Sequence, residues 1–207
     1  MSSAGRSKRR ENDYYPSPVW TLKLLLNRLK LDPKDTFLDP SAGDFALYDL
    51  VALESKKWAE LSEGVDYLEN DLDLTADVIA TNPPFLLFER FVETAMNRDL
   101  SRRGTLCLLL RLNALGSHMR KEFWGRYPVT HLLTLTPRPS FTDGGTDSSE
   151  YAWFIWDYGN RYTGPAIGIA SRTEVDPSYV PRKVVKKNPS FKASLVASYK
   201  LRGIRNE

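Results

Sequence analysis

The sequence has few residues of the kinds that build metal centres or covalent cross-links. Its 207 residues include one cysteine, Cys107, and two isolated histidines, His118 and His131. A lone cysteine excludes a disulfide framework, and with two separate histidines it does not make a zinc site, so we expect no metal. No apolar stretch approaches the length that crosses a membrane, and no signal peptide is evident. These absences predict a soluble, cytoplasmic protein with no membrane partner.

Charge is present but is unevenly distributed along the chain. The net charge is only +3, yet residues 1–10 carry four basic and no acidic side chains, and residues 172–207 carry nine basic and three acidic ones. The body between them is therefore acidic. We expect one domain over residues 13–171, flanked by a basic, disordered N-terminal tail (1–12) and a basic C-terminal tail (172–207). Basic tails on an acidic body favour a polyanionic partner.

Strand-like and helix-like segments alternate along the body of the chain. Leucines from Leu22 to Leu29 keep helical spacing, and residues 105–110 form a nearly unbroken apolar run typical of a central parallel strand. Further strands are predicted over 36–38, 58–61, 65–68, 78–80, 131–135 and 151–156, and further helices over 46–57, 85–98 and 116–125. The alternation predicts an α/β fold with a doubly wound sheet. The last two strands lack a helix between them, which indicates an antiparallel edge strand.

Polar residues follow the predicted strands at the points where those strands end. Asp39 closes the first, Glu60 lies at the second, Asp66 at the third and Asn82 at the fourth. In open α/β sheets, ligands bind at the carboxyl ends of the strands. The loop after Asp39 contains one glycine, Gly43, and lacks a G-x-G-x-x-G run, which argues against a cofactor with a pyrophosphate. A carboxylate at that place suits an ammonium group instead.

The segment Asn82-Pro83-Pro84-Phe85 is conformationally restricted. Neither proline has an N–H, and Pro83 disfavours helical geometry at Asn82, so the Asn82 amide is held extended at a strand end. The amide, the Pro83 carbonyl and the Phe85 ring form a polar clamp with one aromatic wall. Such a clamp suits a flat heteroaromatic ring with an exocyclic amine. The alternative interpretation is an ordinary strand-to-helix turn.

Three segments together resemble a known enzyme family. The run Asp39-Pro-Ser-Ala-Gly-Asp44 resembles the first S-adenosylmethionine motif of the N6-adenine DNA methyltransferases, and Asn82-Pro-Pro-Phe85 resembles their catalytic motif. Tyr15-Pro-Ser-Pro18 resembles the extra motif that precedes the cofactor loop. The resemblance covers about residues 13–156, and the compact size is similar to phage or prophage members in a bacterial host cell. It implies a Rossmann-like class I methyltransferase domain.

The resemblance also implies a site for S-adenosyl-L-methionine. Asp39 would meet the methionine ammonium, Glu60 the ribose hydroxyls, and Asp66 with the Tyr67 backbone the adenine. The whole set of cofactor-binding residues that the resemblance implies is Tyr15, Pro16, Ser17, Pro18, Asp39, Pro40, Ser41, Ala42, Gly43, Glu60, Asp66, Tyr67 and Asn82. Where the family usually has a second glycine, this chain has Phe45, whose bulk we expect to crowd the loop.

The catalytic residues that the resemblance implies are Asn82, Pro83, Pro84 and Phe85, acting on the N6 amine of an adenine flipped out of double-stranded DNA. Contacts to nucleic acid are expected from the loop over residues 137–147, from the end of the fifth strand and from the C-terminal tail. The candidates are Arg111, Arg138, Phe141, Lys186 and Lys187. Because so few residues are available to recognise bases, we expect a short or relaxed target sequence.

Other functions fit the same residues. RNA adenine and a protein glutamine amide also present planar nitrogens to an Asn-Pro-Pro clamp. Phe45 motivates a further reading, a non-catalytic relative that binds nucleic acid without the cofactor. The sequence indicates neither the target site nor the oligomeric state.

Overall fold

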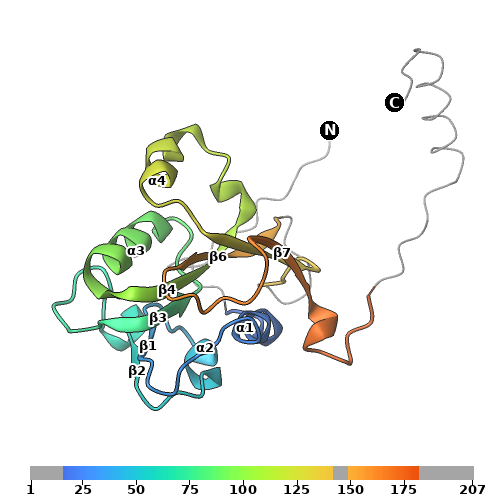
Figure 1. Ribbon diagram of the computed structural model, residues 1–207, viewed down its shortest axis with the longest axis horizontal. Helices are drawn as coiled ribbons and strands as arrows, with labels where there is room; N and C mark the ends of the chain where they lie inside the picture. Colours follow the sequence, from blue (N-terminus) through green and yellow to red (C-terminus); the bar gives the residue numbers. More distant parts are fainter. Residues whose placement is uncertain (1–15, 142–148, 182–207) are drawn as a thin grey trace, which may run out of the picture.

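The computed structural model describes residues 16–141 and 149–181. Within them the chain forms a seven-stranded sheet in the order β2-β1-β3-β4-β6-β5-β7 (Figure 1). The strands are β1 (Phe37–Asp39), β2 (Lys56–Trp58), β3 (Ala76–Thr81), β4 (Leu100–Arg111), β5 (His131–Thr136), β6 (Tyr151–Asp157) and β7 (Ile167–Ser171). The chain passes from β1 to β2 on one side and later to β3 on the other, so the direction of winding reverses at β1.

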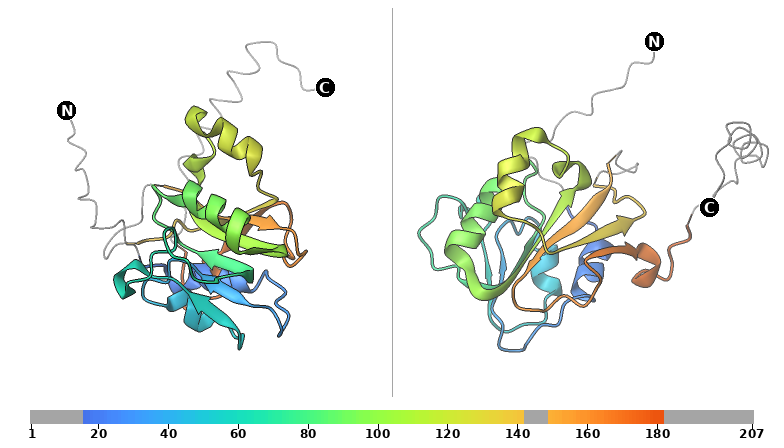
Figure 2. Two further views of the ribbon diagram at one scale, coloured as in Figure 1. Left: turned by 90° about the vertical axis from the view of Figure 1, so that its left-hand side faces the viewer. Right: turned by 45° about the horizontal axis from the view of Figure 1, so that its top comes forward.

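Helices cover both faces of the sheet (Figures 1 and 2). The first face carries α1 (Val19–Leu26) and α2 (Ala46–Leu50), and the second carries α3 (Phe88–Thr94) and α4 (Lys121–Arg126). Side chains alternate along each strand, so Val78 packs towards α1 while Ile79 packs towards α3. The two apolar layers that result bury both faces of β3 and β4. The doubly wound α/β fold is confirmed.

The strand that runs against the others is β6, which pairs antiparallel with both β4 and β5. The antiparallel pair expected near the sheet edge is therefore present as β5 and β6. The sequence analysis did not predict β7, which pairs parallel with β5 and extends the sheet by one strand. Its pattern is short and interrupted, because Gly168 and Ala170 are the inward residues and supply little apolar signal.

Three local predictions on the first half of the chain are wrong. Residues 46–57 do not form one helix, because α2 ends at Leu50 and Val51 is extended. The strand predicted over 58–61 is β2, which lies earlier at Lys56–Trp58, where it pairs with β1. Residues 65–68 form no strand; Leu68 N instead donates to the Asp66 side chain at 2.9 Å, a local turn that competes with strand pairing.

The helices of the second half are shorter than predicted. The helix expected over 85–98 is α3 followed by a π-helical turn, η3 (Ala95–Asp99). The one expected over 116–125 is a 3₁₀ turn, η5 (His118–Arg120), that leads into α4. Residues 172–181, assigned to the C-terminal tail, include η6 (Arg172–Glu174), and Glu174 accepts a bond of 2.7 Å from Arg28 at the end of α1. Residues 1–12, and the rest of the tail from 182, lie outside the described residues.

No helix within the described ranges is both long and apolar enough to cross a bilayer.

Candidate active site

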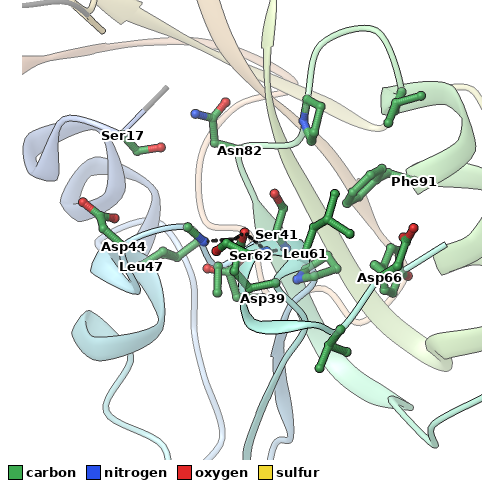
Figure 3. Close-up of a pocket in the computed structure, with 18 of the residues that line it drawn as sticks. Ser17, Asp39, Ser41, Asp44, Leu47, Leu61, Ser62, Asp66, Asn82 and Phe91 are labelled. Atoms are coloured by element: carbon green, nitrogen blue, oxygen red, sulfur yellow. Dashed lines mark hydrogen bonds between the residues drawn. The ribbon is translucent and has the colours of Figure 1, made fainter. Parts of the chain in front are cut away.

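A cavity of about 410 Å³ opens at the carboxyl ends of β1, β2 and β3, where the direction of winding reverses. Open α/β sheets bind ligands at this place. Figure 3 shows Asp39, Ser41 and Asn82 around the cavity, with Asp44 and Leu47 at one end and Asp66 and Phe91 at the other. The residues predicted for the cofactor that line it are Pro16, Ser17, Asp39, Pro40, Ser41, Ala42, Gly43, Glu60, Asp66, Tyr67 and Asn82.

Asp39 is the last residue of β1 and is 2% exposed. Burial raises its pKa to about 7, hydrogen bonds from Thr81 and the Ser41 backbone oppose that rise, and the charges of Glu60 and Asp44 add to it. A carboxyl group in this condition stays protonated until the pH approaches neutral, or until a cation arrives beside it. The position therefore suits an ammonium group, which would stabilise the ionised form.

The glycine loop is tied to β2 through Glu60. Gly43 has a φ of 56°, in the left-handed region, and its N–H donates to Glu60 Oε2 at 2.7 Å. The other oxygen of Glu60 accepts from the N–H and the hydroxyl of Ser62 at 3.0 and 2.8 Å, capping the 3₁₀ turn η2 (Leu61–Glu63). Glu60 thus holds the loop and the turn together, and a ribose hydroxyl would have to share Oε2 with the Gly43 amide.

Phe45 does not crowd the cavity. Its ring packs edge-on against Trp58 and Tyr48, with centroids 5.2 and 5.9 Å away, and it is not among the lining residues. The absence of a glycine at this position instead affects the backbone, because Phe45 adopts a φ of 62°, in the left-handed region that glycine favours. A side chain in this region carries a strain of about 1–2 kcal/mol.

The far end of the cavity is formed by the segment around Asp66 and Tyr67. Asp66 Oδ1 accepts from Leu68 N at 2.9 Å, while Oδ2 accepts no bond from any residue within 16–141 and 149–181. Tyr67 is 2% exposed and its ring packs on Phe91. An acceptor beside a wall of apolar side chains fits the amine edge and the face of a purine.

Asn82 leaves β3 directly beside the cavity, and Pro84 also lines it. Phe85 faces another way, into a cluster with Tyr151 and Phe141, whose ring centroids lie 5.8 and 6.3 Å from its own. Arg111 completes this cluster, with its guanidinium carbon 4.8 Å from the Phe85 ring centre and its Nε donating to the Tyr151 hydroxyl at 2.9 Å. The tetrapeptide therefore connects the cavity with a separate aromatic and cationic cluster.

The structure separates the remaining predicted contacts. Pro18 caps α1, accepting from Thr21, and does not line the cavity. Arg138 is exposed and pairs with Glu150 at 2.9 Å, whereas Phe141 is 6% exposed. Tyr15, Lys186, Lys187 and residues 142–147 of the expected recognition loop lie outside the described part of the chain. The roles assigned to all of these residues stay predictions.

Several lining residues were missed by the sequence analysis. Leu61 and Val65 add apolar surface, and Phe91 adds an aromatic wall from α3. Arg90 also lines the cavity and pairs with Glu69 at 2.6 Å. The sequence analysis assigned residues 58–61 and 65–68 to strands, so neither member of the apolar pair was expected in a turn, and no pattern placed α3 against the loop.

Comparison with known proteins supports the fold. No family model matches the sequence, and no curated protein matches it. Solved structures do match: the M protein of the type I restriction enzyme EcoKI at a TM-score of 0.54 and 14% identity, over 76% of this chain and 48% of that one. The fold is that of the class I methyltransferases. A protein described as a class I S-adenosylmethionine-dependent methyltransferase from Listeria monocytogenes matches at 0.53 and 13% identity, over 86% of this chain and 67% of its own.

A further match is described as the modification subunit of a type I restriction enzyme from Vibrio vulnificus YJ016, at a TM-score of 0.51 and 14% identity, over 93% of this chain and 54% of that one. The chain thus spans about half the length of the restriction-enzyme subunits that it matches. At these identities the likeness concerns the fold. Among the described residues, no group of three His, Cys, Asp or Glu side chains could hold a metal ion.

Proposed function

We propose that the protein transfers a methyl group from S-adenosyl-L-methionine to the N6 amine of an adenine flipped out of double-stranded DNA. The observation that carries the proposal is the position of Asn82-Pro83-Pro84-Phe85 at the end of β3, between the acidic cavity and the cluster of Phe85, Tyr151 and Arg111. One side of the tetrapeptide would face the methyl donor and the other the target base.

The cavity fits the donor by the chemistry of its residues. Asp39 lies at the end of β1, where a cation would stabilise its ionised form, and Asp66 with its available Oδ2 lies at the end of the cavity near Phe91. Glu60, two residues beyond β2 and at the N-cap of η2, also lines the cavity, and its carboxylate would accept from the ribose hydroxyls. The bound cofactor supplies an electrophilic methyl group, and these residues orient it towards Asn82.

The target amine is a poor nucleophile because its lone pair is delocalised into the ring. The Asn82 side-chain oxygen and the Pro83 carbonyl would accept hydrogen bonds from its two N–H groups, draw the nitrogen towards tetrahedral geometry and aim the lone pair at the methyl group. The N–CH3 bond would form as the methyl–sulfur bond breaks, leaving S-adenosylhomocysteine, and the methylated amine would then release one proton to water. Pro83 is buried and has no N–H, so the clamp keeps its shape without reorganisation. Catalysis by positioning and electrostatics needs no strong base.

The flipped base would stack on Phe85, which offsets part of the cost of unstacking it from the duplex. Arg111, held by Tyr151, would meet a phosphate or the base edge beside it. Lys186 and Lys187, with Arg138, would neutralise backbone phosphates, consistent with basic tails on an acidic body. The domain would span residues 13–171, in the cytoplasm of a bacterial host.

The test is methyl transfer from tritiated S-adenosylmethionine to DNA, RNA and a glutamine-containing peptide in parallel. We expect label in DNA, as N6-methyladenine, and its loss in Asn82→Ala. Asn27→Ala is the matched control, because Asn27 is exposed at the end of α1 and outside the cavity.

Label in RNA or peptide instead would identify one of the alternative substrates. Cofactor binding without any transfer would indicate a non-catalytic relative. A random-sequence duplex library tests the breadth of recognition, and a strict site of about six or more base pairs would contradict the expected short target.

A further inference from the structure

The segment from Asp66 to Asn70 forms the adenine end of the proposed cofactor site, yet no strand supports it. Asp66, Tyr67 and Leu68 line the cavity. The segment closes on itself: Asn70 donates to the Asp66 carbonyl from its backbone at 3.0 Å and from its side chain at 2.6 Å. The buried Tyr67 ring packs on Phe91, and Glu69 pairs with Arg90, but among the described residues the backbone of the turn is not paired with a strand. The position of its backbone over the cavity therefore depends on side chains from elsewhere.

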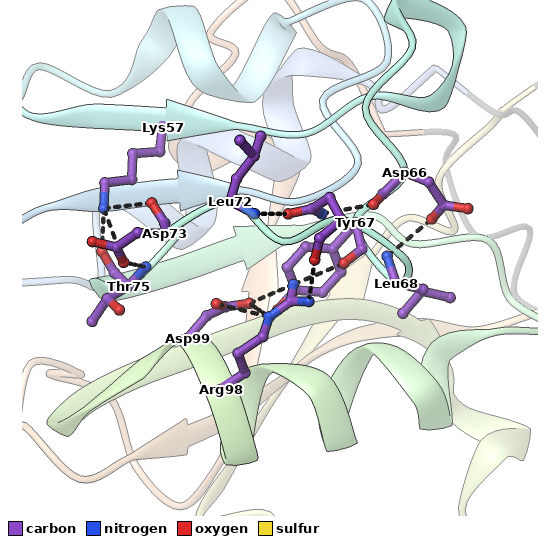
Figure 4. A network of polar contacts seen from close by, with 10 residues as sticks. Lys57, Asp66, Tyr67, Leu68, Leu72, Asp73, Thr75, Arg98 and Asp99 are labelled. Carbon is purple, nitrogen blue, oxygen red and sulfur yellow. Dashed lines mark hydrogen bonds and ion pairs between the residues drawn. The ribbon is translucent and has the colours of Figure 1, made fainter.

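Arg98, on the π-helical turn η3, supplies those contacts (Figure 4). Its Nη2 donates to the Tyr67 carbonyl at 2.8 Å and its Nη1 donates to the Asn70 carbonyl at 3.0 Å. The guanidinium carbon lies 5.2 Å from the centre of the Tyr67 ring. One side chain therefore holds both ends of the turn that follows Asp66. Single π-helical turns occur often at functional sites.

Asp99 fixes the guanidinium in turn. Arg98 Nε lies 3.1 Å from each Asp99 carboxylate oxygen, and Nη2 lies 3.0 Å from Oδ2. The Asp99 side chain is 2% exposed, whereas that of Arg98 is 35% exposed. A buried carboxylate needs a charged, hydrogen-bonded partner. The planar fork of arginine meets Asp99 along one edge and still presents N–H groups to two carbonyls.

We propose that Arg98 is a positioning residue for the cofactor's adenine, which sets the Asp66 carboxylate at the height of the adenine amine by holding the Tyr67 and Asn70 carbonyls. This rests on the proposed function, because it assumes that the cavity binds S-adenosylmethionine. Arg98 is outside the cavity lining and acts through Asp66. It therefore governs selectivity for adenine rather than contact with the cofactor.

The experiment measures binding by calorimetry with two ligands, S-adenosylhomocysteine and its inosine counterpart, which lacks the amine. The central variant is Arg98→Lys. It keeps a positive charge beside Asp99 and so protects the fold, but one ammonium cannot serve Asp99 and both carbonyls as a fork. Arg98→Ala is the second variant. Arg126→Ala is the matched control, since Arg126 is exposed on α4 and pairs with Glu93 at 3.8 Å.

For both Arg98 variants we expect the Kd of the adenine ligand to rise about 10-fold, while the Kd of the inosine ligand changes by less than about 2-fold. Combined with Asp66→Ala, the Arg98 substitutions should have no further effect on adenine binding, because the two residues act as a unit. If Arg98 had only a structural role, its substitution would reduce the affinity for both ligands to the same extent.

Equal losses for the two ligands, or unchanged adenine affinity, would overturn the inference. Wild-type protein that binds neither ligand would overturn the cofactor site and this inference together. Absence of DNA methylation, with the expected ligand pattern intact, would overturn the proposed substrate and still support the role of Arg98.

Discussion

The two ends of the cavity are built differently. At one end Asp39 and Asn82 are at the termini of β1 and β3, neighbouring strands that pair in register within a buried sheet. At the other end Asp66 and Tyr67 lie on a turn outside the sheet, held by hydrogen bonds from Arg98. Chemistry at the target amine is thus proposed on the sheet, while recognition of the cofactor's base is proposed on a turn that side chains hold in place.

Glu60 connects the two ends, because its carboxylate bonds both the Gly43 amide of the β1 loop and Ser62 of η2. The comparison predicts different responses to substitution. Changes at the sheet end should affect catalysis or the protonation of the site, and changes at the turn should affect cofactor affinity alone.

The largest effect is expected at Asn82. Asn82→Ala removes one acceptor for the target amine, which should lower kcat about 10³-fold, in line with the loss of one preorganised hydrogen-bonding group at other reacting centres. The Kd of S-adenosylhomocysteine should change by less than about 3-fold, since the cavity keeps Asp39, Glu60 and Asp66. Single-turnover kinetics and calorimetry separate the two quantities. Loss of cofactor binding with kcat retained at saturation would contradict the assignment of catalysis to the sheet end.

The next effect concerns Asp39 and pH. Its folded pKa of about 7 lies above the ordinary value of 3.8 for an aspartate, so the folded, unliganded state holds a proton between these values that the unfolded chain has released. Stability contributed by this group therefore falls as the pH rises through that window. A bound ammonium group would favour the ionised form of Asp39 over the protonated form. The carboxyl must therefore release its proton when the cofactor binds below pH 7. Cofactor affinity should thus rise about 25-fold between pH 5.5 and 7.5.

Calorimetry in buffers of different ionisation enthalpy measures the released proton directly. Binding of the cofactor should release about one proton per protein at pH 5.5 and about a quarter of a proton at pH 7.5. Asp39→Asn is the matched variant, because the amide keeps the shape of the group and cannot titrate. A pH profile that persists in Asp39→Asn would assign the proton to another group.

A smaller effect is expected at the turn. Asp66→Ala removes the proposed acceptor for the adenine amine, and affinity for S-adenosylhomocysteine should fall about 10-fold, as for the loss of one hydrogen bond to a charged group. At saturating cofactor kcat should remain within about 2-fold. Glu63→Ala is the control, because Glu63 is exposed on the neighbouring η2 and outside the cavity lining. A large fall in kcat at saturation would show that the turn takes part in catalysis and would remove the distinction between the two ends.

The same distinction explains what could be predicted from the sequence. Asp39 closes and Asn82 follows an apolar strand, Glu60 follows the short β2, and β1, β2 and β3 bring their carboxyl ends to one sheet edge, so their order and spacing indicated their assembly. Asp66 was assigned to the correct cavity on the assumption of a strand that does not exist. The turn that contains Asp66 is shaped by the hydrogen bond from Leu68 N to the Asp66 side chain and is held by Arg98, 32 positions later in the sequence. Hydrophobic periodicity carries no information about such contacts.

The helices show a related difference. The spacing of Leu47, Leu50 and Val51 predicted a long helix, but after α2 the chain turns extended to let Lys56–Trp58 pair with β1. Sheet pairing outweighed local helical spacing there. The strands β3 and β6 and the buried second half of β4 were predicted well, because stretches covered on both faces are nearly all apolar; the first five residues of β4, which include two exposed arginines, were not predicted.

The smallest expected effect on binding is at Phe45, which lies beside the sheet end but packs outside the cavity. Phe45→Ala should leave the Kd of S-adenosylhomocysteine within about 2-fold and lower the free energy of unfolding by about 1–2 kcal/mol, because the half-buried ring loses its contacts with Trp58 and Tyr48. Phe45→Gly separates ring from backbone, since glycine adopts the φ of 62° without strain. It should therefore unfold at a higher urea concentration than Phe45→Ala, and its free energy of unfolding should be higher by up to about 1 kcal/mol. A fall in cofactor affinity beyond about 5-fold in Phe45→Ala would show that the aromatic packing behind the glycine loop shapes the sheet end of the cavity, and that this end too depends on side-chain contacts.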